Sequence, residues 1–77
     1  MQLNNLASLL EDWGRFDDAA ALFQQSLEVR RTAYGAEHPA VARALHNLAR
    51  VTLARGRPGE AAPLAEGRAT IEVRSFD

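Results

Sequence analysis

Apolar residues recur at helical spacing from the beginning of the chain. Leu3, Leu6, Ala7 and Leu10 stand at positions i, i+3, i+4 and i+7, which predicts an amphipathic helix. Gly14 interrupts the pattern, and glycine readily takes the left-handed conformation found just beyond a helix end. The pattern therefore predicts a first helix that ends before Gly14.

A second apolar stripe consists of Ala19, Ala20, Phe23, Ser26 and Leu27. Asp17 and Asp18 precede it, where carboxylates stabilise a helix N-terminus, and Arg30 and Arg31 stand near its end, where cations do the same. Residues 32–39 are predicted to form a connection, because the chain there contains a glycine and then a proline suited to the first turn of the next helix.

A third stripe consists of Val41, Leu45, Leu48, Ala49 and Thr52. Gly56 ends it, and Pro58 and Glu60 begin a fourth helical pattern. This fourth helix is the weak one, because Gly67 in its interior costs about 1 kcal/mol relative to alanine. The alternating tail, residues 70–76, is interpreted as a helix end rather than a strand. The expected fold is all-α, with four helices in two antiparallel hairpins.

The chain repeats itself with a period of 42 residues. The run LNNLA from Leu3 returns as LHNLA from Leu45. Other identities at this offset are Gly14 with Gly56, Arg15 with Arg57, Ala19 and Ala20 with Ala61 and Ala62, and Leu22 with Leu64. A fixed period of this size indicates a repeat architecture, in which each unit buries its apolar face by stacking on a neighbour. We expect one domain, 1–77, with repeat one at about 1–34, a loop at 35–38 and repeat two at about 39–74.

The composition narrows the class of protein. The chain has 77 residues, a net charge of −1 and no cysteine, so it forms at most one small domain without disulfides or thiol chemistry. The charge disfavours nucleic-acid binding, and no apolar run reaches the ~20 residues of a membrane span. These features favour a cytoplasmic location, and arginine as the only basic residue besides histidine hints at a bacterial source. The first helical pattern begins without a capping residue. We therefore interpret the chain as a piece of a longer array, with a short natural protein as the alternative.

No combination of residues predicts catalysis, a metal site or a cofactor. Ser8, Ser26 and Ser75 have no nucleophile motif around them. His38 and His46 are eight positions apart, whereas a helical pair of metal ligands needs a spacing of i, i+4. We expect His38 to make a loop or capping contact and the protein not to be an enzyme.

The motifs resemble tetratricopeptide repeats. The run LNNLA, then GRFDDA, then GAEHPAVA, and again LHNLA followed by GRPGEAAPL is similar to the 42-residue variety found in kinesin light chains and in bacterial multidomain regulators. The resemblance covers essentially the whole chain. It implies hairpins stacked as an α-α superhelix, and a scaffold that binds an extended segment of another protein in a concave groove.

The resemblance also implies which residues line that groove. Eight of them are taken as the binding site: Asn4, Asn5, Ser8 and Asp12 in the first unit and Arg43, His46, Asn47 and Arg50 in the second. Met1, Glu11 and Ala54 are groove positions as well. Asn5 and Asn47 match the family's groove asparagine, whose amide both donates and accepts hydrogen bonds and suits a peptide backbone. The alternative is that each asparagine bonds to a neighbouring helix or to water.

Charge divides unevenly between the two units. Residues 1–38 carry a net charge of −3 and residues 39–77 a net charge of +2. Arg43, His46, Asn47 and Arg50 form one largely basic stripe at helical spacing. We therefore predict a ligand carboxylate, from an acidic side chain or a C-terminus, near Arg43 and Arg50, because the guanidinium fork suits carboxylates. The alternative is a solvated helix face.

A second functional hypothesis is structural. A two-repeat piece leaves apolar end faces uncovered, so the chain is also a candidate for self-association through its ends or by exchange of its fourth helix. Under this hypothesis, a charge at Leu3, Ala65 or Ile71 changes the mass in solution. Trp13, beside Gly14, is interpreted as packing at the hairpin corner, with a partner anchor as the alternative.

Overall fold

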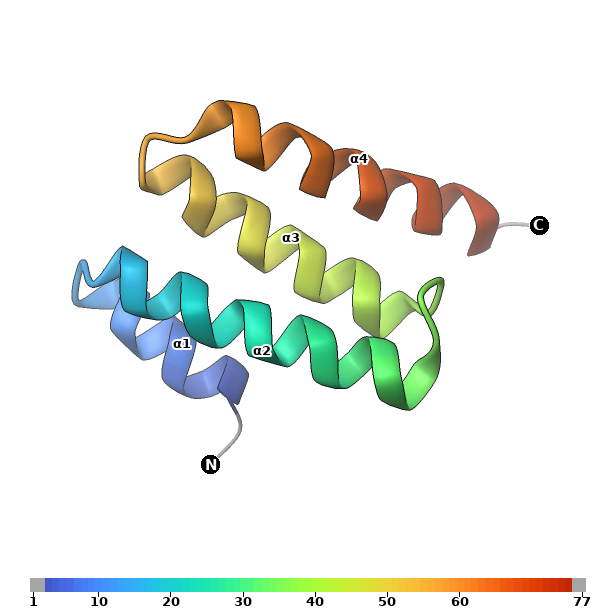
Figure 1. Cartoon of the computed structure of the whole chain (residues 1–77), viewed down its shortest axis with the longest axis horizontal. Helices are drawn as coiled ribbons and strands as arrows, with labels where there is room; N and C mark the ends of the chain where they lie inside the picture. The colour runs from blue at the N-terminus through green and yellow to red at the C-terminus, as the bar shows by residue number, and fades with distance from the viewer. Residues whose placement is uncertain (1–2, 76–77) are drawn as a thin grey trace.

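The computed structural model describes residues 3–75, which form four α-helices joined by short connections (Figure 1). They are α1 (Leu3–Asp12), α2 (Phe16–Tyr34), α3 (Pro39–Ala54) and α4 (Pro58–Ser75). The all-α prediction of two helical hairpins is confirmed, and the described part of the tail continues α4 as a helix. Met1, predicted at the groove, and Phe76, in the predicted tail, lie outside the described residues.

The helix ends follow from local sequence. Gly14 has φ 79°, the left-handed conformation predicted for it, and Gly56, predicted to end the third helix, has φ 77°. In each case the glycine N–H and the next N–H bond back to carbonyls three and five residues earlier, so the last turn keeps its hydrogen bonds. His38 caps α3 as expected, because its Nδ1 accepts a hydrogen bond of 3.0 Å from the N–H of Ala40.

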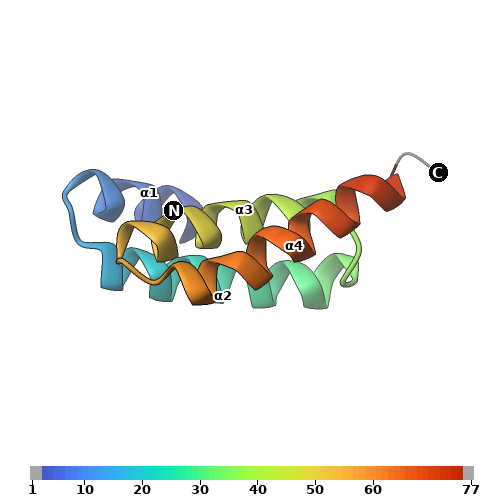
Figure 2. The ribbon, with the colours of Figure 1, turned by 90° about the horizontal axis from the view of Figure 1, so that it is seen from above.

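The helices form two layers. Along the slab they follow chain order, with α2 packed on α1 and α3, and α3 packed on α4 (Figure 1). Seen from above, α1 and α3 share one layer, and α2 lies in the other (Figure 2). The molecule measures 39 × 29 × 15 Å, so it is a slab about two helices thick. Its most deeply buried large side chains are Phe23, Leu27, Val41 and Val51.

Helix α3 is the central element, and it is buried more widely than its predicted stripe. Ala42, Ala44 and Val51 are buried although they lie outside that stripe. The stripe assumed a single packing surface, whereas α3 packs on α2 along one flank and on α4 along another. Ile71, one of the positions named for the self-association hypothesis, belongs to the core, because α4 turns this side chain inward and leaves it 5% exposed.

Gly67 has a packing role that its helix propensity did not reveal. A Cβ at this position would stand 3.3 Å from Cδ1 of Leu45 on α3. Here α4 therefore approaches α3 closely because the residue has no side chain. Among the described residues, no helix is long and apolar enough to cross a membrane.

Candidate functional site

The eight residues predicted to line a groove come from α1 and α3, which lie in the same layer (Figure 2). We call this surface the α1/α3 face, defined by Asn4, Asn5, Ser8, Asp12, Arg43, His46, Asn47 and Arg50. Asn5, Asp12, Arg43, His46 and Arg50 are exposed, and the other three are half-buried. All eight are therefore accessible at least in part, although they do not all have the same bonding partners.

Two of these side chains join the repeats to each other. Nδ2 of Asn47 donates a hydrogen bond of 3.0 Å to Oδ1 of Asn4. Arg50 donates two hydrogen bonds to the carboxylate of Glu11, at 2.9 Å from Nε and 2.6 Å from Nη2. Of the two roles left open for the asparagines, Asn47 has the contact with a neighbouring helix, and peptide binding stays a prediction.

The pair with Glu11 determines the electrostatics of Arg50. The hydrogen bonds that Arg50 donates to Glu11 are the main cause that raises the pKa of Arg50 above its ordinary value. Burial opposes this rise, and the negative charges of Glu11 and Asp12 add to it. The guanidinium is therefore charged at every physiological pH, and its two-pronged edge is already occupied by a carboxylate of the same chain.

Five residues of the face have no such partner within residues 3–75, and three of these bear on the binding of a ligand. Within residues 3–75, the side chains of Asn5, Arg43 and His46 make no hydrogen bond or ion pair. Their polar groups are exposed to solvent and available to a ligand. The two arginines of the predicted carboxylate site therefore differ. The guanidinium of Arg43 has no bonding partner within the described residues, whereas that of Arg50 is bonded to Glu11.

Arg43 stands on the wall of a hollow of about 580 Å³ between α3 and α4. The lining residues are Pro39, Ala42, Arg43, His46, Arg68, Ile71 and Glu72, and we call this site the Arg43 hollow. Arg68 also donates a hydrogen bond of 3.0 Å to Glu72, one turn further along α4. The hollow combines an apolar floor with two guanidinium groups and one carboxylate, so its walls favour an anion with an apolar neighbour.

The sequence reasoning missed the α4 side of this hollow. Arg68 and Glu72 were not recognised because the groove was assigned to α1 and α3 alone. The 42-residue period offered a signal, since Arg68 replaces Ser26 of the first unit, which is buried. An arginine at a position that is otherwise small and buried indicates that repeat two presents a different surface there.

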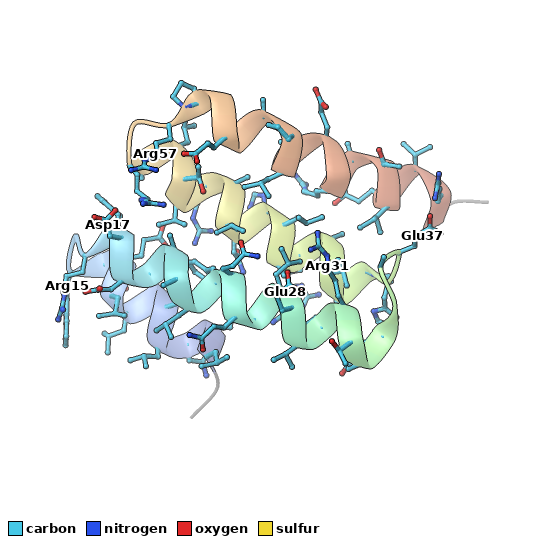
Figure 3. The ribbon with its side chains drawn as sticks, viewed as in Figure 1. Arg15, Asp17, Glu28, Arg31, Glu37 and Arg57 are labelled. Carbon is cyan, nitrogen blue, oxygen red and sulfur yellow. The ribbon has the colours of Figure 1, made fainter. Side chains whose placement is uncertain are left out.

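The opposite side of the molecule is charged but locally neutral. On the outward face of α2, Arg31 bonds Glu28 at 3.1 Å, and at the corners Arg15 bonds Asp18 and Arg57 bonds Glu60 (Figure 3). These pairs lie three residues apart and are exposed, so each contributes little. This side shows no concentrated charge that would select a partner.

Trp13 differs from its prediction. Its side chain is 65% exposed at the α1–α2 corner, so the expected packing there is wrong. The physical reason is the tight turn at Gly14, which leaves no neighbouring element over the indole. The alternative, that Trp13 anchors a partner, stays a prediction.

The fold and the α1/α3 face define a helical-hairpin repeat protein. Two helical hairpins lie side by side, and the first helix of each lies in the same layer. Among residues 3–75, no group of three potential metal ligands is present.

Comparison with known proteins gives the particular family. Residues 1–66 match the tetratricopeptide repeat profile. Nephrocystin-3 of Xenopus laevis is 39% identical over 70 residues, which cover 82% of this chain and 5% of that protein. The Mus musculus protein of the same name is 41% identical over 59 residues, and these cover 77% of the chain and 4% of the relative.

The chain belongs to the tetratricopeptide repeat family. Repeats of this family are non-catalytic and mediate protein–protein interactions. The chain spans about one-twentieth of the relatives' length. These relatives are vertebrate proteins, and the hint of a bacterial source is not tested by them.

Proposed function

We propose that this module binds an extended segment of another protein along the α1/α3 face, with a carboxylate of that segment in the Arg43 hollow. The observation that carries the proposal is Arg43, an exposed guanidinium without an internal partner on the wall of an apolar-floored hollow. Charge-assisted, two-pronged hydrogen bonds to a carboxylate are the strongest contacts that such a group makes.

The internal contacts support this position over the neighbouring one. A ligand carboxylate at Arg50 has to displace Glu11 from two short hydrogen bonds, whereas at Arg43 it displaces only water. Arg68, on the opposite wall of the hollow, adds a second guanidinium, although Glu72 neutralises part of its charge. The carboxylate therefore has its most favourable position between α3 and α4, close to the edge of the α1/α3 face.

The ligand backbone has its own contact on the same face. Asn5 is exposed with an unbonded amide, and Asn47, its counterpart one repeat later, bonds Asn4. Asn5 is therefore the amide that can both donate to and accept from an extended peptide. The bound segment extends from α1 across α3 to the hollow, and its carboxylate end lies nearest α4.

The proposal is tested with peptides selected from a displayed library with free C-termini. The affinity of the best binder is measured for the unmodified chain and for Arg43→Ala, Asn5→Ala and Arg31→Ala. Arg43→Ala is expected to weaken binding about 10- to 100-fold, since a hydrogen bond to a charged group contributes about 1.5–3 kcal/mol. Arg31→Ala, an exposed arginine on the other side of the molecule, is the matched control and is expected to leave the affinity unchanged.

The peptide is then amidated at its C-terminus, or its acidic side chains are replaced by amides, which distinguishes the two sources of the carboxylate. One of these changes is expected to reproduce the loss seen with Arg43→Ala and to have no further effect on that variant. Equal loss with Arg31→Ala, or binding that ignores both the carboxylate and Arg43, contradicts the proposal.

A further inference from the structure

Equivalent residues of α2 and α4, which lie 42 positions apart, differ in burial. Ala20, Phe23 and Leu27 of α2 are at most 6% exposed, as part of the core that α3 completes. Their counterparts 42 residues later are Ala62, Ala65 and Ala69, which are exposed. The difference follows from the neighbours, because α3 covers the first hairpin and no described element covers the second.

This uncovered surface is a defined groove rather than a flat patch. Between α3 and α4 lies a hollow of about 440 Å³, which we call the alanine groove. It is lined by Ala49, Leu53, Pro58, Ala61, Ala62 and Ala65, together with His46 and Arg50 of the α1/α3 face. Leu53 is 58% exposed there. An exposed, mainly apolar groove of this kind indicates a docking surface.

The opposite end of the slab offers a helix of matching kind. Leu9 on α1 is 39% exposed, whereas its counterpart on α3, Val51, is fully buried. Leu6 and Leu10 are half-buried, whereas the matching residues of α3 are buried. Helix α1 thus carries the apolar residues that α3 uses for docking, on a flank that nothing in the described chain covers.

We propose that a second copy of this chain docks its α1 in the alanine groove, as α3 docks on the first hairpin within one chain. The internal junction is the structural template, and α1 and α3 share the LxNLA run that makes it. The contact joins two different surfaces, so it leaves a free groove at one end and a free α1 at the other, and copies add in a row without closure.

The residues at the junction between copies follow from the internal junction. Each residue of the internal junction is replaced by its counterpart one repeat, or 42 residues, away. Within the chain, Arg50 bonds Glu11, and Arg55 bonds Asp17 at 2.7 Å. Between copies, Ser8 of the second copy takes the place of Arg50, and Leu53 takes that of Glu11. Both ion pairs are thereby replaced by apolar or small groups, which is the chemistry of a dockable surface.

The second of these replaced pairs gives the exposed tryptophan a role. Trp13 of the second copy stands at the position of Arg55, opposite Gly59 at the position of Asp17. No atom lies within 4 Å of where a Cβ of Gly59 would be, so there is room for an indole. The junction between copies therefore covers a side chain that is otherwise 65% exposed.

Docking leaves the Arg43 hollow accessible along part of its length. Helix α1 begins at Leu3, the counterpart of Leu45, whereas α3 begins at Pro39. The Arg43 hollow lies toward the N-terminal end of α3, whereas Leu53 and Pro58 of the alanine groove lie at and beyond its C-terminal end. The two surfaces meet at His46, which lines both hollows. Substitutions at Leu53 and at Arg43, each of which lines one hollow alone, therefore distinguish self-association from peptide binding.

The test is the weight-average mass by sedimentation equilibrium over a wide range of concentration. The unmodified chain is expected to rise above its monomer mass of 8.4 kDa with concentration and to show no plateau at the dimer. Leu53→Glu is expected to abolish the rise. Adding Ser8→Arg to that variant is expected to restore it, because the pair recreates between copies the contact of Glu11 with Arg50.

The matched control is Ala21→Glu, which puts the same charge at an exposed alanine of α2 outside both docking surfaces. Circular dichroism verifies that each variant is folded. Three results overturn the proposal: a constant mass of 8.4 kDa for the unmodified chain, a rise that survives Leu53→Glu, or a folded double variant that stays monomeric. A constant monomer mass of the unmodified chain would mean that a further repeat or another protein, and not a second copy, docks in the alanine groove.

Discussion

At the scale of single residues, two different roles of glycine are seen in this chain. Gly14 and Gly56 end helices in a left-handed conformation, and the repeat period places them at equivalent positions. Gly67 permits a close approach of two helices. Gly59, near the start of α4, has neither a positive φ nor a close neighbour. Only the first role has a reliable sequence signal, because it depends on the local backbone.

Gly14→Ala is expected to destabilise the protein by about 1–2 kcal/mol, because a Cβ in the left-handed conformation meets the following carbonyl oxygen. Gly59→Ala is the matched control and is expected to be neutral or to stabilise by up to about 1 kcal/mol, since alanine favours a helix. Urea unfolding of both variants measures the effect. Equal effects of the two substitutions would show that the conformation of Gly14 does not determine its contribution.

At the scale of elements, the junction between hairpins depends on polar contacts around an apolar centre. Arg30 of α2 donates a hydrogen bond of 3.0 Å to the carbonyl of Ala40 on α3. Glu37, in the loop before α3, pairs with Arg74 at the end of α4 (Figure 3). Together with the contacts of Asn47 and Arg50, these bonds set the register in which the second hairpin stacks on the first.

A double-mutant cycle on Glu11 and Arg50 is expected to give a coupling of about 0.5–1 kcal/mol, at the upper end for partly exposed pairs, because Glu11 is only 18% exposed and the contact is two-pronged. The cycle on Glu28 and Arg31 is the control and is expected to give about 0.3 kcal/mol, because its carboxylate is 58% exposed and its single contact joins residues one turn apart on a helix. The raised pKa of Arg50 means that its stabilising effect is complete below its ordinary pKa and lost only above it. The Glu11–Arg50 coupling is therefore expected to fall with added salt but not with a change of pH near neutrality.

At the scale of the whole molecule, two stacked hairpins bury only part of their apolar surface. Stability in such repeat proteins is approximately the sum of each repeat's own contribution and one interface per neighbouring pair. This chain has one internal interface for two repeats, and the alanine groove is the surface of a second interface that the described chain does not complete. Covering that groove should therefore stabilise the whole molecule.

The corresponding prediction is an extended chain in which a copy of residues 35–76 replaces Asp77 and continues the 42-residue period. Its unfolding free energy is expected to rise by at least about 2 kcal/mol, since burial of one leucine contributes about 1.5–3 kcal/mol. The urea m-value should rise with the surface exposed on unfolding. Leu53→Glu is expected to stabilise this extended chain further, because the new carboxylate faces the appended copy of Arg50, and no such gain is expected in the 77-residue chain. Two separate unfolding transitions would contradict the shared interface.

The sequence predicted much of the fold and less of the candidate site. The helices, their ends at Gly14 and Gly56, the cap at His38 and the family follow from local patterns and from the period. The inward position of Ile71, the exposure of Trp13 and the α4 wall of the Arg43 hollow did not follow from them, because each depends on where another helix lies.

By itself, the sequence determined which segments are helical, where they end and that the two units repeat, because turns, caps and amphipathic stripes depend on neighbours within one or two turns of chain. The tertiary structure decided which polar groups are available to a partner. Asn47 and Arg50 are engaged, and Arg43 and Asn5 are accessible, because hydrogen bonds between hairpins join residues about forty positions apart. Similar motifs in the two repeats thus have different roles, because α3 packs between α2 and α4, whereas α1 packs mainly on α2.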